Sequence, residues 1–102
     1  MTLTITDLLV RDIRFPTSRG RHGSDAVNVD PDYSAAYVIL RTDDPRGREG
    51  HGLAFTLGRG TEVCSAMIRV LRPLVAGRSL AAITGDFAGF WRRLTQDSQL
   101  RW

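Results

Sequence analysis

Residues 34–42 have the sequence SAAYVILRT. It is rich in β-branched and aromatic residues, which predicts a strand that is well buried on at least one side. Residues 43–47 (DDPRG) are turn formers, and residues 50–56 predict another strand. Because the link between the two strands is short, they should form an antiparallel hairpin.

A further strand is predicted upstream, over residues 3–15. Its apolar residues alternate at first, and the alternation slips near Asp7 and again around Arg11 and Asp12. We therefore expect a long strand that changes its buried face through a bulge or bend. The simplest arrangement of the three strands is an antiparallel meander.

Helical spacing replaces strand alternation after Gly60. Thr61 is the expected N-cap of a helix, and Glu62 suits its positive end. Pro73 should end or kink this helix near Arg72. The stripe expected to face the core consists of Val63, Cys64, Met67, Ile68, Val70, Leu71, Leu74 and Val75.

Two shorter helical segments are predicted next. Gly77 should terminate the preceding helix, residues 79–83 predict a short helical turn, and residues 86–97 predict a second helix. Strands followed by helices give an α+β fold, in which a three-stranded antiparallel β-meander is covered by helices packed on one face. The second helix should present Phe87, Phe90, Trp91 and Leu94 to the core, and Arg92, Arg93, Gln96 and Asp97 to solvent.

Length and composition describe one ordinary domain. The chain has 102 residues, no apolar run of membrane-spanning length, and no basic start with an apolar core like that of a signal peptide. We therefore expect a cytoplasmic protein without a membrane partner. Its single cysteine, Cys64, cannot form an internal disulfide and fits core packing better than reactivity.

The basic residues restrict both partners and chemistry. All fourteen are arginine, and they are dispersed among eleven acidic residues for a net charge of +3. Nucleic-acid binders usually gather such charge into a stripe, so no nucleic-acid partner is expected. Arginine stays protonated and is a poor general base, and His22 and His51 lack the spacing of metal ligands. We therefore expect neither catalytic nor metal-binding residues in this chain.

A long polar connection, residues 15–33 (FPTSRGRHGSDAVNVDPDY), joins the first two strands. Connections of this length are usually functional or disordered. Pro16 and Pro31 fix its two ends, and Gly20 and Gly23 permit unusual backbone angles. It is either a loose surface excursion or a loop that is placed against a ligand, and the residues alone leave both interpretations open.

Four stretches carry a resemblance to a known family: RDIRFPTS at 11–18, HGSDAVNVDPDYSAAYVILRTDD at 22–44, GLAFTLGRGTEV at 52–63 and GDFAGFWRRLTQDSQLRW at 85–102. Together they resemble the N-terminal domain of L-fuconate dehydratase, of the mandelate racemase-like branch of the enolase superfamily. The resemblance covers nearly the whole chain, and DPDYSAAYV and LTQDSQLRW are more specific than fold-level similarity.

The resemblance implies that residues 1–102 form the capping domain of a larger enzyme. In such enzymes a C-terminal (β/α)8 barrel carries Mg2+ and the acid/base residues. They abstract the proton next to the carboxylate of a sugar acid, after which water is lost. A barrel needs about 250 residues, so this chain does not include one. The implied partners are a barrel and a sugar-acid substrate, with homo-oligomers common in the family, and the chain alone should be inactive.

The resemblance also implies substrate contacts within the long connection. Gly23, Ser24, Asp25 and Tyr33 match positions at which the capping domain contacts substrate. Glycine lets backbone approach a ligand, and the polar groups can bind sugar hydroxyls. Asp25 could instead cap a turn, and Tyr33 could be a half-buried strand residue. His22 and Arg59 also lie where they could face a barrel.

Two functional hypotheses are left open. The first is the substrate-gating cap of a Mg2+-dependent sugar-acid dehydratase. The second is a small α+β module that binds an anionic ligand on its own, since the chain is rich in arginine. The resemblance favours the first, and tight ligand binding by the isolated chain would favour the second.

Overall fold

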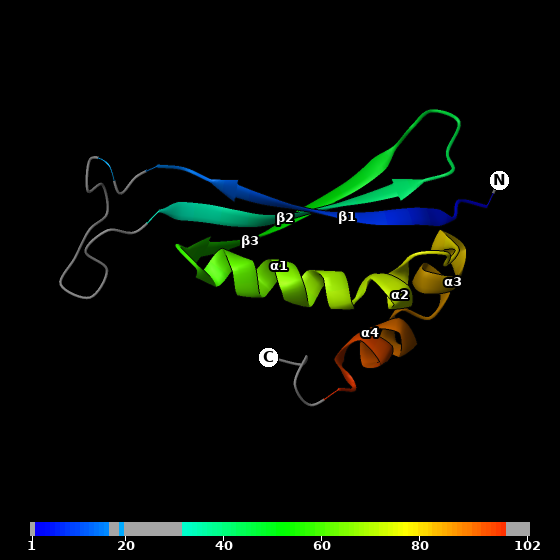
Figure 1. The fold of residues 1–102 in the computed structure, drawn as a ribbon. Helices are drawn as coiled ribbons and strands as arrows, with labels where there is room; N and C mark the ends of the chain where they lie inside the picture. Colours follow the sequence, from blue (N-terminus) through cyan, green and yellow to red (C-terminus); the bar gives the residue numbers. More distant parts are fainter. Residues whose placement is uncertain (1, 17–18, 20–31, 98–102) are drawn as a thin grey trace.

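Three antiparallel strands and four helices build the domain in the computed structural model, which describes residues 2–16, 19 and 32–97. The strands are β1 (Ile5–Arg14), β2 (Tyr33–Thr42) and β3 (Glu49–Leu57), in the spatial order β1-β2-β3. The helices α1 (Gly60–Val70), α2 (Arg72–Val75), α3 (Leu80–Gly85) and α4 (Phe87–Thr95) all lie on one side of this sheet (Figure 1). This arrangement confirms the predicted α+β meander with helices on one face.

The β1–β2 pairing explains the irregular alternation in the first strand. Its register shifts between Ile5 and Asp7, which is the predicted bulge. From Asp7 to Arg14 the register is continuous, so the second predicted slip, around Arg11 and Asp12, is wrong. The apolar residues of this stretch simply occupy both faces of the strand, and that imitates a slip in the sequence.

The β2–β3 hairpin turns through residues 43–48, and a buried aspartate organises it. The Asp44 carboxylate accepts a hydrogen bond from the backbone N–H of Arg46 (3.0 Å) and another from the guanidinium of Arg48. These two donors hold the pKa of Asp44 below its usual value. Gly47 completes the turn with a φ of 71°, which favours glycine.

Helix α1 differs from its prediction in which residues face the sheet. Its N-cap is Arg59, so Thr61 lies inside the first turn rather than capping it. Thr61 and Ser65 are the buried residues, whereas Val63 and Val70 are 71% and 57% exposed. The predicted stripe was therefore wrong at both valines, although Glu62 does lie in the first turn and Ile68 packs against the core.

The helical breaks fall where the sequence predicted them. Leu71 separates α1 from α2, Pro73 lies in the first turn of α2, and Gly77 follows with a φ of 87°. Ser79 caps α3 by accepting a hydrogen bond from Ala82 N–H at 3.0 Å. The carboxylate of Asp86 caps α4 in the same way, through the N–H of Gly89 at 3.0 Å.

The core lies between the sheet and the helices. Phe90 of α4 is buried in it, but Phe87 and Trp91, which were predicted to share that face, are largely exposed. Cys64 is half-buried and free. No helix among the described residues is long and apolar enough to span a membrane. The core residues are Ile5, Leu8, Val75, Ile83 and Phe90, with Val10, Val38, Leu40, Ile68 and Leu94 packed against them.

Candidate functional site

One end of the sheet gathers the start of the long connection, its end, and the start of α1. The N–H of Phe15 donates to the carbonyl of Tyr33 (2.8 Å), which brings the two ends of the connection together. The N–H of Gly58 donates to the carbonyl of Asp32 (2.9 Å), which joins them to the β3–α1 junction. We call this region the loop end of the domain.

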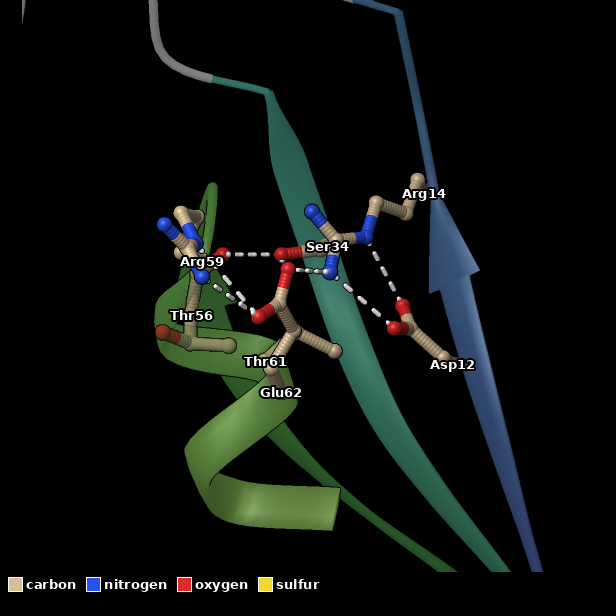
Figure 2. A network of polar contacts seen from close by, with 7 residues as sticks. All are labelled: Asp12, Arg14, Ser34, Thr56, Arg59, Thr61 and Glu62. Carbon is tan, nitrogen blue, oxygen red and sulfur yellow. Dashed lines mark hydrogen bonds and ion pairs between the residues drawn. The ribbon is translucent and has the colours of Figure 1, made fainter. Parts of the chain in front are cut away.

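A chain of alternating charges crosses the helix side of the loop end (Figure 2). The Arg14 guanidinium binds the Asp12 carboxylate through two hydrogen bonds of 2.9 and 3.0 Å. A third nitrogen–oxygen contact, of 3.5 Å, joins Arg14 to Glu62, and Glu62 also accepts a hydrogen bond from Arg59 at 3.4 Å. Strand β1 and helix α1 are thereby linked through side chains that stay partly exposed.

Asp12 and Arg14 shift each other's pKa. The hydrogen bonds from Arg14 lower the pKa of Asp12, and the same bonds raise the pKa of Arg14. A general base near neutral pH would need a pKa shifted toward neutrality, and these groups shift the other way. Asp12 and Arg14 are therefore fixed charges rather than proton-transfer groups.

Beneath the charges lies a layer of buried hydroxyls that brings α1 close to β2. The Ser34 hydroxyl donates to the carbonyl of Thr56 (3.0 Å) and also shares a hydrogen bond with the Thr61 hydroxyl. Ser34 and Thr61 are almost completely buried. Gly60 is needed here, because a Cβ at that position would collide with the Thr56 side chain. Small residues thus let the first turn of α1 lie directly on the sheet.

The predicted substrate-contacting residues are only partly placed. Gly23, Ser24 and Asp25 lie outside the described residues, as does His22. Tyr33 is the first residue of β2, half-buried, with its ring edge-on to Phe55 at a centroid distance of 5.6 Å. It adjoins the connection at the loop end, and its predicted contact with substrate stays a prediction.

The charged network of Asp12, Arg14, Arg59 and Glu62 was not predicted from the sequence. Asp12 and Arg14 are two residues apart and so lie on the same face of β1, which is a signal that alternation alone could have shown. What alternation could not show is that Glu62 would meet them, because this requires the packing of α1 on the sheet. Arg59 was singled out, and its side chain is 91% exposed at the loop end.

The described residues include no group of three or more histidine, cysteine, aspartate or glutamate side chains that could hold a metal ion. His51, the one histidine described, lies on β3, away from the helix side of the loop end. Its ring accepts or donates a hydrogen bond with the Tyr37 hydroxyl at 2.8 Å. The loop end can therefore present hydrogen-bonding groups and positively charged arginine side chains to a ligand.

The fold and the sequence together place this chain with the N-terminal domains of enolase-superfamily proteins, to which it is homologous. No protein-family model matches the chain. The crystal structure of human mitochondrial enolase superfamily member 1 superimposes with a TM-score of 0.89 at 53% identity, covering 99% of this chain and 23% of that one.

Curated relatives give the same result. The bovine (Bos taurus) mitochondrial enolase superfamily member 1 is 57% identical over 98 residues. L-Galactonate dehydratase of Hypocrea jecorina is 47% identical over 100 residues. The matches cover 96% and 98% of this chain, respectively, but the chain spans about 22% of the length of each relative. In these relatives the matched region is the N-terminal part of a larger protein.

Proposed function

We propose that this chain is the substrate-gating cap of a sugar-acid dehydratase, acting together with a C-terminal barrel domain. The observation that carries the proposal is the match of nearly the whole chain to the N-terminal region of much longer enzymes, one of which is named L-galactonate dehydratase. The loop end supports it, because the structure joins both ends of the long connection there beside an arginine-containing network.

In this proposal the cap binds substrate and the barrel performs the chemistry. Gly23, Ser24, Asp25 and Tyr33 would contact the hydroxyl groups of an L-fuconate-type sugar acid. Mg2+ would be held by the barrel, since the described residues of this chain offer no cluster of ligands for it. The presence of one cysteine is consistent with a reducing compartment, and we propose the cytoplasm.

A chimeric enzyme tests the proposal directly. This chain would replace the homologous N-terminal region of the Hypocrea jecorina enzyme, and dehydration of L-galactonate and L-fuconate with Mg2+ would be measured. The chimera should be active and the isolated 102-residue chain inactive. Dehydration by the isolated chain would refute the cap, and tight binding of a sugar acid by the isolated chain in calorimetry would favour the stand-alone module.

The site residues are tested within the same chimera. Asp25→Ala should reduce kcat/KM by about tenfold or more, as expected when a charged hydrogen bond to substrate is lost. Asp43→Ala is the matched control, because Asp43 lies in the hairpin at the opposite end of the sheet, where its carboxylate accepts a hydrogen bond from the backbone N–H of Thr4. Equal kinetics in the two variants would remove Asp25 from the site.

A further inference from the structure

The helices cover the sheet unevenly. Ser34 and Ala36 of β2 lie on the helix side of the sheet and are buried there, because residues two apart on a strand share a face. The register pairs Ala54 of β3 with Ala36, so Ala54 lies on the helix side too. Ala54 is nevertheless exposed, although Ala36 next to it is completely buried. The layer of described helices therefore leaves this part of β3 uncovered.

Helix α1 leans toward the opposite edge of the sheet, which β1 forms. Glu62 in its first turn lies 3.5 Å from the guanidinium of Arg14 on β1. Arg72, which follows the helix, donates a hydrogen bond of 2.6 Å to Asp7 of β1. Three half-buried apolar residues lie about 140–200° around the helix from Glu62: Cys64, Met67 and Leu71. Helix α1 therefore turns a partly covered apolar side toward β3.

An apolar trough lies along this side of α1. Its volume is about 280 Å³, and every residue that lines it is apolar. Strand β2, helix α1 and helix α4 contribute, respectively, Val38 and Leu40, Ile68 and Leu71, and Phe90 and Leu94. Leu40 also lines a second hollow, of about 270 Å³, that extends to Gly50 and Leu3. Pockets for small molecules usually add a few polar groups to an apolar lining, so the apolar trough fits an apolar protein segment better.

We propose that the apolar trough binds the apolar face of a helix from the part of the longer protein that follows the matched region. This inference rests on the proposed function, in which a C-terminal part acts together with the cap. Neighbouring helices pack about 8–10 Å apart and neighbouring strands about 4.8 Å apart, so three strands give room for a second helix beside α1. Gly50 and Ala54 carry no large side chain on that side, which lets a helix approach the sheet closely.

The place where the chain leaves α4 favours this occupant over a separate molecule. Leu94, in the last turn of α4, lines the apolar trough, and α4 ends at Thr95. The chain spans about 22% of the length of its relatives and corresponds to their N-terminal part, so a much larger segment follows in them. A segment that is attached next to its binding site has a higher effective concentration there than a free partner has.

Thiol labelling of the chimera with the Hypocrea jecorina enzyme tests whether the apolar trough is covered. Ala54→Cys places a thiol on the helix side of β3, and Arg46→Cys, in the exposed hairpin turn, is the matched control. Peptide mass spectrometry reads each position separately from Cys64. Relative to the control, Ala54→Cys should react about tenfold more slowly in the chimera than in the isolated 102-residue chain. If circular dichroism shows that the isolated chain does not fold, the two rates within the chimera are compared, and the same difference is expected.

Photo-cross-linking identifies the segment that covers the apolar trough. A diazirine-containing amino acid replaces Ala54 in the chimera, and mass spectrometry identifies the cross-linked peptides. The cross-links should fall on apolar residues of the first helix after the region that this chain replaces. The same amino acid in place of Arg46 is the control and should give no cross-link to that helix.

Slow labelling at position 54 together with cross-links to that helix supports the proposal. Equal labelling at positions 54 and 46 would overturn it, as would cross-links to a second copy or to another part of the enzyme. Dehydratase activity of the same chimera is a separate readout. An active chimera with an uncovered trough contradicts only this inference, whereas an inactive chimera with a covered trough contradicts only the proposed cap function.

Discussion

Replacing Thr61 by valine removes one hydroxyl from the contact between α1 and β2 and keeps the shape of the side chain. The Thr61 hydroxyl shares a hydrogen bond with Ser34, and both residues are almost completely buried. A neutral hydrogen bond contributes about 1 kcal/mol net to stability. Ser34 retains its bond to the carbonyl of Thr56, so it is not left without a partner. We therefore expect Thr61→Val to cost about 1 kcal/mol.

Ser65 lies one turn further along the same helix and should respond with the opposite sign. Its hydroxyl is buried and finds no hydrogen-bond partner within the part of the chain that the structure describes. Removing an unpaired buried hydroxyl relieves a desolvation cost, and alanine favours a helix more than serine does. Ser65→Ala should therefore stabilise the domain by about 0.5–1 kcal/mol.

Urea unfolding followed by circular dichroism measures both changes. For a domain of this size, 1 kcal/mol corresponds to a shift of about 4 °C or more in Tm. The single variant Ser34→Ala and the double variant with Thr61→Val complete a double-mutant cycle. A coupling free energy of about 0.5–1 kcal/mol would be the contribution of the hydrogen bond between the two hydroxyls. The reasoning would be refuted if Thr61→Val and Ser65→Ala changed the free energy of unfolding in the same direction. A coupling free energy near zero between Ser34 and Thr61 would refute it as well.

Three further predictions concern the core, a backbone position and acid stability. Phe90→Ala should cost about 3–5 kcal/mol in urea unfolding because its ring is buried, whereas Trp91→Ala, at an exposed site, should cost under about 1 kcal/mol. Gly77→Ala should cost about 1–2 kcal/mol because φ is 87°, and Gly85→Ala, which meets open space, should be neutral or stabilising in the same assay. The lowered pKa of Asp44 means that the native state binds fewer protons than the unfolded one. Its contribution is therefore complete above about pH 4 and lost as pH falls further, so Asp44→Asn should flatten the acid side of a Tm-against-pH curve.

The sheet could be predicted from sequence because each of its signals is local. The strand over residues 33–42, the turn around Asp44 and the bulge near Asp7 each follow from residue types within a few positions. The helical breaks at Pro73 and Gly77 are local in the same way. These features depend on backbone geometry that the residue itself restricts, so no knowledge of packing was needed to find them.

The inward face of α1 could not be predicted by counting apolar residues. At 100° per residue, Val63 and Val70 lie about 200° and 180° around the helix from Thr61, on the opposite side. The buried centre of the helix consists instead of Thr61 and Ser65. The burial of Thr61 depends on Ser34 of β2, which it contacts, and the sequence of the helix alone does not indicate this contact.

The candidate site shows the same division between local and distant information. Its location at the end of β1 and the start of β2 follows from the length and polarity of the connection alone. The charge network cannot be predicted in this way, because Arg14 and Glu62 are 48 positions apart in the sequence and meet only when α1 packs on the sheet (Figure 2). The substrate contacts implied for Gly23, Ser24, Asp25 and Tyr33 stay predictions, since the first three lie outside the described residues and the position of Tyr33 in β2 does not decide its contact.

The ionisation state of the loop end limits what a cap of this kind can contribute to a dehydration. Proton abstraction next to a carboxylate needs a base whose pKa lies near the working pH. Asp12 and Glu62 at this end are paired with arginine, and the hydrogen bonds from Arg14 move the pKa of Asp12 further from that range. Fixed charges of both signs can orient an anionic substrate and tie α1 to β1 without taking up or releasing protons. In the cap proposed here, the loop end therefore contributes to substrate binding and closure. Variants of Arg14 in the chimera should change KM and leave the pH dependence of kcat largely unchanged.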